Sequence, residues 1–380
     1  MAGRSAVDKV LTLRGGPELV AFWAQLGSII EVVAGVALAG VGTGISVLVA
    51  QADRPERQRE LLTESLRLGF AVSAPVMLAV VAGSLVFPGA LTGDGVSQGL
   101  VALGAAVGCV AIVPGMLNGY WLGQQRRGLM LTLASGSAAL QLAAALAAPQ
   151  GHVLTALALA MAAPALALFF VARAPASDGN RSPLRRYILP GFTIGVLTPL
   201  AAVAVREIVS AQMSWHEVGL VQSLWRVSDW VASVAAGVMA VHFLPRLAAA
   251  HGTPRFAGEL RRAAFATILP SAIALAAVGA LHRPVLSLLY DESFRMSDTT
   301  VALFFAGTLA RIASWLPLYA LYAMRRTGPL VVGEFLSMPL FAVLLVAYPR
   351  PLSLEAAGAL WLTAYLGYGL FNLWAVRRAS

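Results

Sequence analysis

The chain of 380 residues is far more apolar than a soluble protein, because 58% of its residues are hydrophobic and only 12% are charged. Soluble domains carry about 25% charged residues, so the composition excludes an ordinary soluble fold and indicates a polytopic membrane protein. The net charge of +9 could suggest a nucleic-acid-binding protein, but the arginines lie in short connectors between apolar runs. That distribution is typical of membrane topology. The single cysteine, Cys109, excludes disulfides within the chain and thiolate metal clusters.

Apolar stretches long enough to cross a bilayer recur along the whole sequence. A helix needs about 20 apolar residues to cross the hydrocarbon layer. The sequence therefore predicts an all-α protein with about eleven transmembrane helices, over residues 19–50, 66–92, 97–123, 129–148, 152–173, 187–209, 217–244, 264–289, 300–324, 328–348 and 353–376. The connectors are short and none is large enough for an extramembrane domain. Residues 1–16 are basic but lack the apolar core of a signal peptide.

Arginines alternate between the two sets of connectors. One set holds 18 of them, at positions 54, 57, 59, 67, 126, 127, 173, 181, 185, 186, 246, 255, 261, 262, 325, 326, 377 and 378. The opposite set holds four, Arg206, Arg283, Arg295 and Arg350. Cytoplasmic loops are enriched in arginine and lysine, so this asymmetry predicts a cytoplasmic C-terminus. Eleven spans then place the N-terminus outside although residues 1–16 are basic, so this segment either lies flat at the interface or follows a further helix.

Two segments of the sequence resemble each other. Residues 17–40 and 216–240 begin similarly, about 199 residues apart, and each precedes five further predicted spans. Two parallel halves of a transporter would give this spacing. We therefore expect an N-terminal segment (1–16), an N-terminal bundle of about five helices (17–173), a cytoplasmic linker (174–186), a six-helix C-terminal bundle (187–376) and a cytoplasmic tail (377–380).

The predicted helix 217–244 carries four polar residues on one narrow stripe. Gln222, Arg226, Asp229 and Ser233 follow one another in steps of 4, 3 and 4 residues, which keeps them on one side of a helix. Lipid does not tolerate such a stripe, so it must face protein or water. Either Arg226 pairs with Asp229 within the helix and aids packing, or the stripe lines a solvated cavity. The two interpretations are compatible.

Other predicted helices also carry polar groups at membrane depth. On 300–324, Thr308, Arg311, Trp315 and Tyr322 share one side, and on 19–50 a buried acid, Glu31, shares a face with small residues. Asn118 ends a face that contains Gly104, Gly108 and Gly115, and Arg206 lies near the outer end of its helix. Glycine faces are typical of helix packing. Ionisable groups at depth are functional candidates, and these are Glu31, Arg226, Asp229 and Arg311.

Signatures of enzymes are absent from the sequence. It contains no H-E-x-x-H, Walker A, G-x-S-x-G or dinucleotide-binding motif, and its five histidines have no metal-ligand spacing. The sequence therefore predicts neither an enzyme nor a bound metal or cofactor. Transport without an ATP site would use diffusion, an ion gradient or the substrate gradient.

The stretch "WHEVGLVQSLWRVSDWVASVAAGVMAVHFLPRL" (215–247) resembles the Wzx-type flippases of lipid-linked O-antigen and enterobacterial-common-antigen oligosaccharides, within the superfamily that includes MATE exporters. The matching positions are Trp215, Glu217, Val218, Gly219, Gln222, Ser228, Asp229, Phe243, Leu244, Pro245 and Leu247. Weaker likeness at 40–51, 116–128 and 291–323 extends the resemblance over nearly the whole chain. Arg226 departs from the motif, which usually has a small or neutral residue there.

The resemblance implies two six-helix bundles around a central cavity that opens alternately to either side of the membrane. Residues 9–17 resemble the tail of the family's first helix, whose apolar body is missing or truncated. The implied activity is the flipping of undecaprenyl-pyrophosphate-linked oligosaccharide to the outer leaflet of the bacterial inner membrane, for surface polysaccharide synthesis. The implied partners are this substrate, membrane lipids and other polysaccharide assembly proteins, with no nucleic acid.

We hypothesise that arginines in the cavity bind the pyrophosphate. Arg311 and Arg226 would hold the head group, with Arg206 near the outer mouth. Asp229 would position Arg226 or weaken binding for release. The remaining candidates for the cavity wall are Gln222, Glu31, Trp315 and Asn118.

Four alternatives remain open. A MATE-like drug or cation antiporter and a lipid II flippase would share the fold and the polar stripes. A membrane polysaccharide polymerase or ligase usually has a large periplasmic loop, whereas no connector here exceeds about 20 residues. A structural membrane protein would fit the missing helix but not the buried charges.

Overall fold

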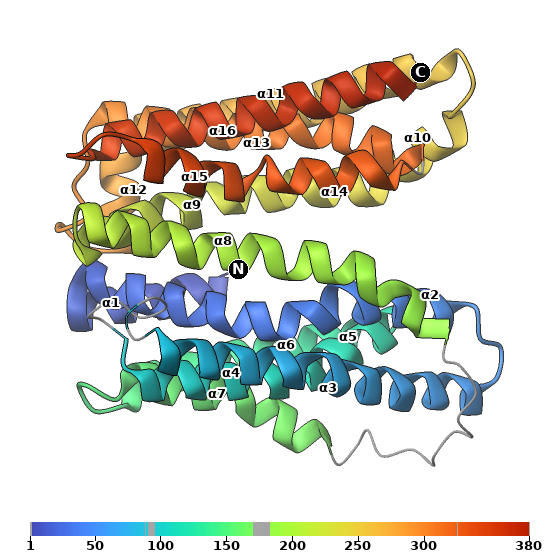
Figure 1. Ribbon diagram of the computed structural model, residues 1–380, viewed down its shortest axis with the longest axis horizontal. Helices are drawn as coiled ribbons and strands as arrows, with labels where there is room; N and C mark the ends of the chain where they lie inside the picture. Colours follow the sequence, from blue (N-terminus) through green and yellow to red (C-terminus); the bar gives the residue numbers. More distant parts are fainter. Residues whose placement is uncertain (1, 88, 90–95, 170–182, 325, 380) are drawn as a thin grey trace. The chain divides into compact units, whose positions relative to one another are not determined.

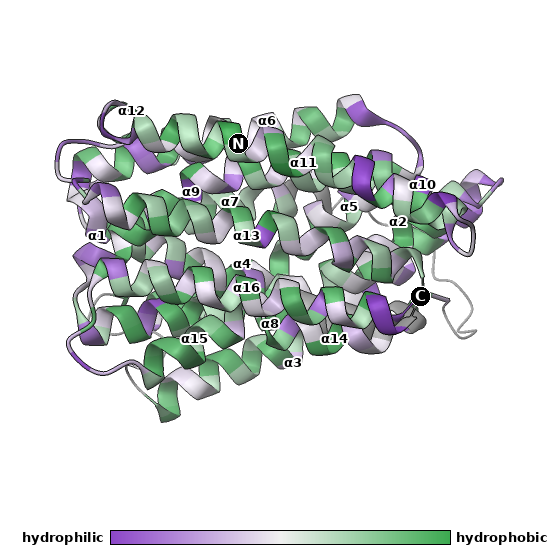
Figure 2. Cartoon of the chain, turned by 90° about the horizontal axis from the view of Figure 1, so that it is seen from above, coloured by the Kyte–Doolittle hydropathy of each residue, from purple (hydrophilic) through white to green (hydrophobic). Residues whose placement is uncertain are grey.

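The computed structural model describes residues 2–87, 89, 96–169, 183–324 and 326–379, and all elements that these residues form are helical (Figure 1). Nine helices in this part of the chain are long and apolar enough to cross a membrane. The other two predicted spans fall on α7 (Val153–Phe169) and α8 (Ile188–Gln212). Figure 2 shows hydrophobic residues along the helices and hydrophilic ones mostly at helix ends and in connectors. The predicted all-α polytopic fold is confirmed.

The chain divides into two compact units. The first contains residues 1–15 and 22–207, and the second contains residues 16–21 and 208–380. The division therefore falls within α8, whereas the sequence suggested a boundary at the linker 174–186, most of which lies outside the described residues. Most of α8 groups with the first unit because its backbone packs closely there. A Cβ atom on Gly195 would lie 2.1 Å from the carbonyl oxygen of Gly35.

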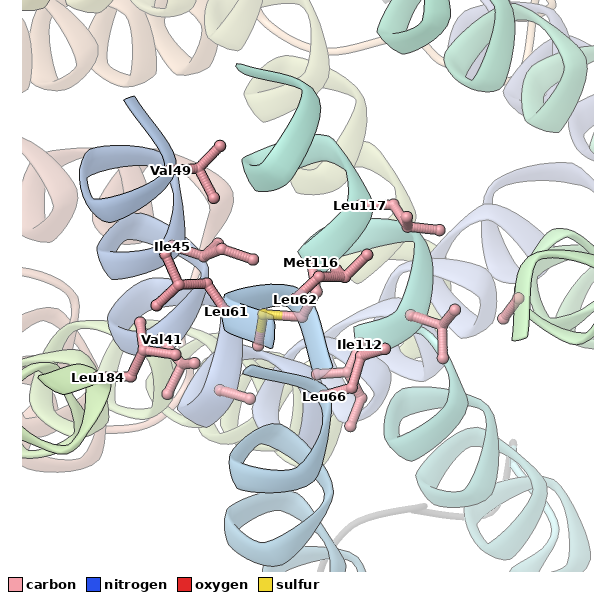
Figure 3. Close-up of a cluster of buried hydrophobic side chains, with 13 residues drawn as sticks. Val41, Ile45, Val49, Leu61, Leu62, Leu66, Ile112, Met116, Leu117 and Leu184 are labelled. Atoms are coloured by element: carbon pink, nitrogen blue, oxygen red, sulfur yellow. The ribbon is translucent and has the colours of Figure 1, made fainter. Parts of the chain in front are cut away.

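The first unit is entirely helical in its described part. Its elements are α1 (Ala2–Ala37), the π-helical turn η1 (Leu38–Gly42), α2 (Thr43–Ala50), α3 (Pro55–Val86), α4 (Gln98–Val110), α5 (Ile112–Gly123), α6 (Arg127–Ala147), α7, the 3-10 turn η2 (Pro183–Tyr187) and most of α8. Here α1, η1 and α2 form one continuous span, and α4 and α5 form another. Side chains from η1, α2, α3 and α5 point toward one another in a buried apolar cluster, which Figure 3 shows with Met116 near its centre.

The second unit is organised around one helix, α13. Its elements are α9 (Trp215–Val238), the π-helical turn η3 (Met239–Phe243), α10 (Leu244–Ala250), α11 (Arg255–Ala280), α12 (His282–Leu289), α13 (Asp298–Ala323), α14 (Thr327–Phe335), α15 (Met338–Ala347) and α16 (Leu354–Ala379). Helix α13 packs along α16 and also contacts α9, α10, α11 and α14. The single helix predicted over 264–289 is wrong, because the backbone leaves the helical region at Leu281 and separates α11 from α12.

The helices of the two units follow the same order, at an interval of 200 residues. Helix α3 begins at Pro55 and α11 at Arg255, α4 begins at Gln98 and α13 at Asp298, and α6 begins at Arg127 and α14 at Thr327. The two π-helical turns recur 201 residues apart, at Leu38–Gly42 and Met239–Phe243. These positions confirm the predicted internal repeat.

The glycine face of α4 and α5 is a packing surface, as the sequence predicted. A Cβ atom on Gly108 would lie 2.7 Å from the carbonyl oxygen of Ile30, and one on Gly119 would lie 2.6 Å from that of Gly42. Bare glycine backbone therefore allows α4 and α5 to approach the α1–α2 segment closely.

The N-terminal part of α1 runs alongside α6. Gly3 lies against the Cβ atom of Ala138, and the guanidinium of Arg14 donates to the carbonyl oxygens of Leu146, at 2.7 Å, and Ala148. Gly16 has a positive φ of 64° and Pro17 has no N–H to donate, so the helical path is interrupted there. Residues 2–15 thus follow the second half of α6 toward its C-terminal end.

Candidate functional site

An ion pair between two helices forms the polar centre of the second unit. Nη2 of Arg311, near the middle of α13, donates to Oδ1 of Asp229 on α9. The guanidinium side chain is 16% exposed and the carboxylate side chain is 47% exposed. The partner of Asp229 is thus a cation from another helix. Arg226 is half-buried on α9 and is engaged in an interaction of its own.

Aromatic rings flank the Arg311 guanidinium. Its Cζ atom lies 5.7 Å from the ring centroid of Trp315 and 5.8 Å from that of Trp361. Trp361 in turn packs against Trp225 and Tyr365, with ring centroids 5.2 and 4.5 Å apart. Aromatic faces attract cations, so these rings hold the guanidinium while one edge of it binds the carboxylate. We call Asp229, Arg311, Trp315 and Trp361 the arginine site.

The remaining residues of the predicted stripe differ in burial along α9. Gln222 is 5% exposed and buried, whereas Ser233 is exposed. Between them, Ser228 is buried and its Oγ lies 3.2 Å from Oγ1 of Thr308 on α13. The stripe therefore begins inside the unit, passes the arginine site and ends at the surface.

The other predicted site residues lie in the first unit. Arg206 is buried on α8 and donates to Oγ of Ser28 at 2.8 Å. Asn118 is half-buried on α5, and its Oδ1 has no hydrogen-bond partner among the described residues. Glu31 is exposed, so the expectation of a buried acid is wrong. The close packing on its helix occurs at Gly35, whereas Glu31 lines an open pocket of about 280 Å³ together with Trp23 and Gln141.

Sequence reasoning missed the polar and aromatic residues of α16. They are Trp361, Tyr365, Tyr368 and Asn372, of which Asn372 is completely buried. The sequence could have identified them, because these positions follow one another in steps of 4, 3 and 4 residues and so share one side of a helix. The stripe on α9 has the same spacing.

The chain is similar to known flippases in sequence and to membrane transporters in fold. No family model matches the chain. It is 25% identical over 395 residues to the lipid III flippase of Escherichia coli (strain K12) and equally to that of Shigella flexneri, covering 98% of this chain and 94% of each relative.

Two solved structures of membrane transporters have a fold similar to that of this chain. An inward-facing multidrug resistance MATE family transporter of the MOP superfamily superposes with a TM-score of 0.77 at 15% identity, covering 100% of this chain and 93% of that one. The lipid II flippase MurJ in an inward closed conformation gives a TM-score of 0.70 at 14% identity, covering 99% and 86%. The chain has the multi-pass helical fold of these transporters, and the proteins it resembles are flippases and transporters, not enzymes, in agreement with the prediction.

Proposed function

We propose that this membrane transporter flips an undecaprenyl-pyrophosphate-linked oligosaccharide from the cytoplasmic to the outer leaflet of the bacterial inner membrane, by alternating access, for synthesis of surface polysaccharides such as O-antigen. The observation that carries the proposal is the arginine site, a cation near the middle of a transmembrane helix with a half-exposed counter-ion. The similarity to lipid III flippases over 98% of the chain supports a lipid-linked substrate.

The chemistry of the substrate explains why arginine is suitable. A pyrophosphate and a sugar chain cannot cross about 30 Å of hydrocarbon unaided. The planar guanidinium can bind two phosphate oxygens at once through parallel hydrogen bonds. The rings of Trp315 and Trp361 keep the guanidinium in place, and the half-buried Trp315 would offer an apolar face to sugars, while the lipid tail stays in the bilayer.

Asp229 would allow Arg311 to release the bound phosphate. Its carboxylate occupies the edge of Arg311 in the structure, so an incoming phosphate must displace an anion that is already there. Because the carboxylate is half-exposed, it can be rehydrated when displaced, which makes the exchange reversible. Arg226, half-buried on the same helix, would contact the head group, whereas Gln222 lies inside the unit. Arg206, Glu31 and Asn118 are the candidate substrate contacts of the first unit taken by itself.

The charge distribution sets the proposed orientation. The arginine-rich connectors, and with them the C-terminus, would lie in the cytoplasm. Substrate would then be loaded from the side on which lipid-linked oligosaccharides are assembled.

A reconstituted assay tests the proposal directly. The full chain is inserted into liposomes with a fluorescent undecaprenyl-pyrophosphate oligosaccharide, and a membrane-impermeant glycosidase reports the fraction on the outer leaflet. We expect rapid exchange with the unaltered chain, at least a tenfold loss with Arg311→Gln, and partial activity with Arg311→Lys. Arg262→Gln is the matched control, because this arginine side chain is 74% exposed.

The rival functions give different outcomes. If Arg311→Gln exchanged substrate at the unaltered rate, the assignment of Arg311 would be wrong. A lipid II flippase would move lipid II and not the longer oligosaccharide. A drug antiporter would move neither, and its deletion would raise drug sensitivity without accumulation of cytoplasmic lipid-linked sugar.

A further inference from the structure

A polar pocket lies beside the short helix α12 in the second unit. It has a volume of about 470 Å³. The side chains that line it include His282, Arg283, Asp291, Glu292, Phe294 and Arg295, and we call it the α12 pocket. Figure 1 shows α12 at the end of this unit opposite to the C-terminus. The α12 pocket and the arginine site share no residue.

Helix α12 has an apolar side and a polar side. Leu281, directly before the helix, and Leu288 are 57% and 77% exposed. Arg283 and Ser287 lie on another side of the helix and line the pocket. A helix with an exposed apolar side and a polar side is typical of the interface between lipid and water. The arginine site is deeper, because Arg311 lies 13 residues after the start of α13, about 20 Å along the helix axis.

Charges of both signs balance in the lining of the α12 pocket. Nη2 of Arg295 donates to Oε2 of Glu292 at 2.9 Å. Nη2 of Arg283 donates to Oδ1 of Asp298 at 3.1 Å, and Asp291 adds a further carboxylate to the lining. The side chains of both ion pairs are 74% to 85% exposed, so they can exchange these bonds for bonds to a ligand. Cations balanced by anions favour neither a pyrophosphate nor a metal ion. They suit a neutral ligand that both donates and accepts hydrogen bonds.

The deep side of the pocket is rigid and contains an unpaired nitrogen. Phe294 is 3% exposed and stacks on Tyr290, with ring centroids 4.5 Å apart. Nδ1 of His282 lies 2.9 Å from the carbonyl oxygen of Gly279, which can only accept, so Nδ1 carries a proton. Nε2 has no hydrogen-bond partner among the described residues and lies 3.6 Å from Oδ1 of Asp298. Buried polar groups are rarely left unpaired, which points to a hydrogen-bonding ligand.

We propose that the α12 pocket binds neutral sugar units of the oligosaccharide on the outer side of the membrane. The substrate and the outward orientation rest on the proposed function, in which Arg283 and Arg295 belong to the arginine-poor outer connectors. A sugar ring carries neighbouring hydroxyls that each donate and accept, and guanidinium and carboxylate groups bind such hydroxyls in pairs. The pocket receives the sugar chain at the membrane surface while the pyrophosphate is still at the depth of Arg311.

The test measures sugar binding to the full chain without a lipid carrier. Saturation-transfer NMR is recorded on the purified chain in a sugar-free detergent, with the methyl glycosides of glucose, galactose, rhamnose and N-acetylglucosamine as probes. We expect transfer to one or more of these glycosides. Glu292→Gln combined with Arg295→Gln should lower the affinity for that glycoside by about tenfold, because hydrogen bonds from charged groups to its hydroxyls are lost.

The matched control is Glu259→Gln combined with Arg262→Gln. Glu259 and Arg262 form an ion pair at 2.7 Å with the same three-residue spacing as Glu292 and Arg295, but neither of them lines the pocket. The control should bind the glycoside like the unaltered chain. Equal binding by the pocket variant, or no transfer to any of the probes, would overturn the proposal.

This outcome can be told apart from failure of the proposed function. If a glycoside binds in the α12 pocket but the liposome assay shows no exchange, the proposed transport is wrong and the sugar site stands. If exchange depends on Arg311 but no glycoside binds, the sugar site alone is wrong.

Discussion

Arg311 on α13 and Asp229 on α9 form an ion pair whose two partners are unequally exposed. The guanidinium side chain is 16% exposed and lies between tryptophan rings, whereas the carboxylate side chain is 47% exposed. The cation is thus fixed by packing, while the anion is free to exchange water. Under the proposed function, an anionic head group would take the place of Asp229 while Arg311 keeps its position.

The first prediction concerns the strength of this pair. Arg311→Gln should lower the free energy of unfolding by about 1–3 kcal/mol, because a hydrogen bond between charged groups is lost while the carboxylate stays hydrated. Asp229→Asn should also lower the free energy of unfolding, and by more than is usual for a half-exposed carboxylate. The reason is that this change leaves the buried guanidinium of Arg311 without its counter-ion. Unfolding in detergent–SDS mixtures measures both.

The double variant separates pairing from packing. If the pair matters as described, the coupling energy from Arg311→Gln, Asp229→Asn and their combination should be about 0.5–3 kcal/mol. Additive effects would show that the two residues act independently.

The second prediction concerns the crossing of α1 and α8. Gly35→Ala should reduce stability and the yield of folded protein strongly, since the new Cβ atom would lie 2.1 Å from the carbonyl oxygen of Gly195. Backbone cannot move aside as a flexible side chain does. Gly258→Ala, a position with open space around it in α11, is the control and should be neutral or stabilising by up to about 1 kcal/mol. Size-exclusion profiles and melting temperatures report the outcome.

The third prediction concerns the end of α6. Arg14 donates to the carbonyl oxygens of Leu146 and Ala148, which have no partner further along that helix. Arg14→Gln should therefore lower stability by about 0.5–2 kcal/mol and speed proteolysis near residue 150. Arg246→Gln, an exposed arginine of the second unit, is the comparison. Equal proteolysis of the two variants would mean that Arg14 does not cap α6.

The fourth prediction concerns orientation. Fluorescent-protein fusions after residue 380 should be bright and alkaline phosphatase fusions inactive, because the arginine-rich connectors are expected to be cytoplasmic. A phosphatase fusion in the connector near Arg350 should be active. The reverse pattern would invert the topology and the proposed direction of transport.

Most of the fold could be predicted from the sequence because each transmembrane helix has a local signal, an apolar run bounded by charges. The break between α14 and α15 at Ser337 also had a local signal, because Pro339 disfavours a helical conformation just before it. It was missed because the apolar run is continuous across the two residues between the helices. The separation of α11 from α12 at Leu281 had a similar signal, because His282, Arg283 and Pro284 follow it directly.

The candidate site was only partly predictable for a different reason. The stripe on α9 and the side of α13 that bears Arg311 could each be identified from spacing. Their pairing joins residues 82 positions apart, and helix periodicity carries no information on which helices meet. For Glu31 the spacing predicted burial that the structure does not have. Glu31 shares a helix face with Gly35, but only Gly35 packs against another backbone and Glu31 is exposed.

The two π-helical turns change the phase of the helix at the same point of both halves. Each inserts one extra residue into an α-helix and rotates everything after it by about 100°. The turns stand 201 residues apart, directly before α2 and α10. The side chains of α2 and α10 are therefore turned by the same angle relative to α1 and α9, so a sequence pattern read as one continuous helix would place them on the wrong face in both units.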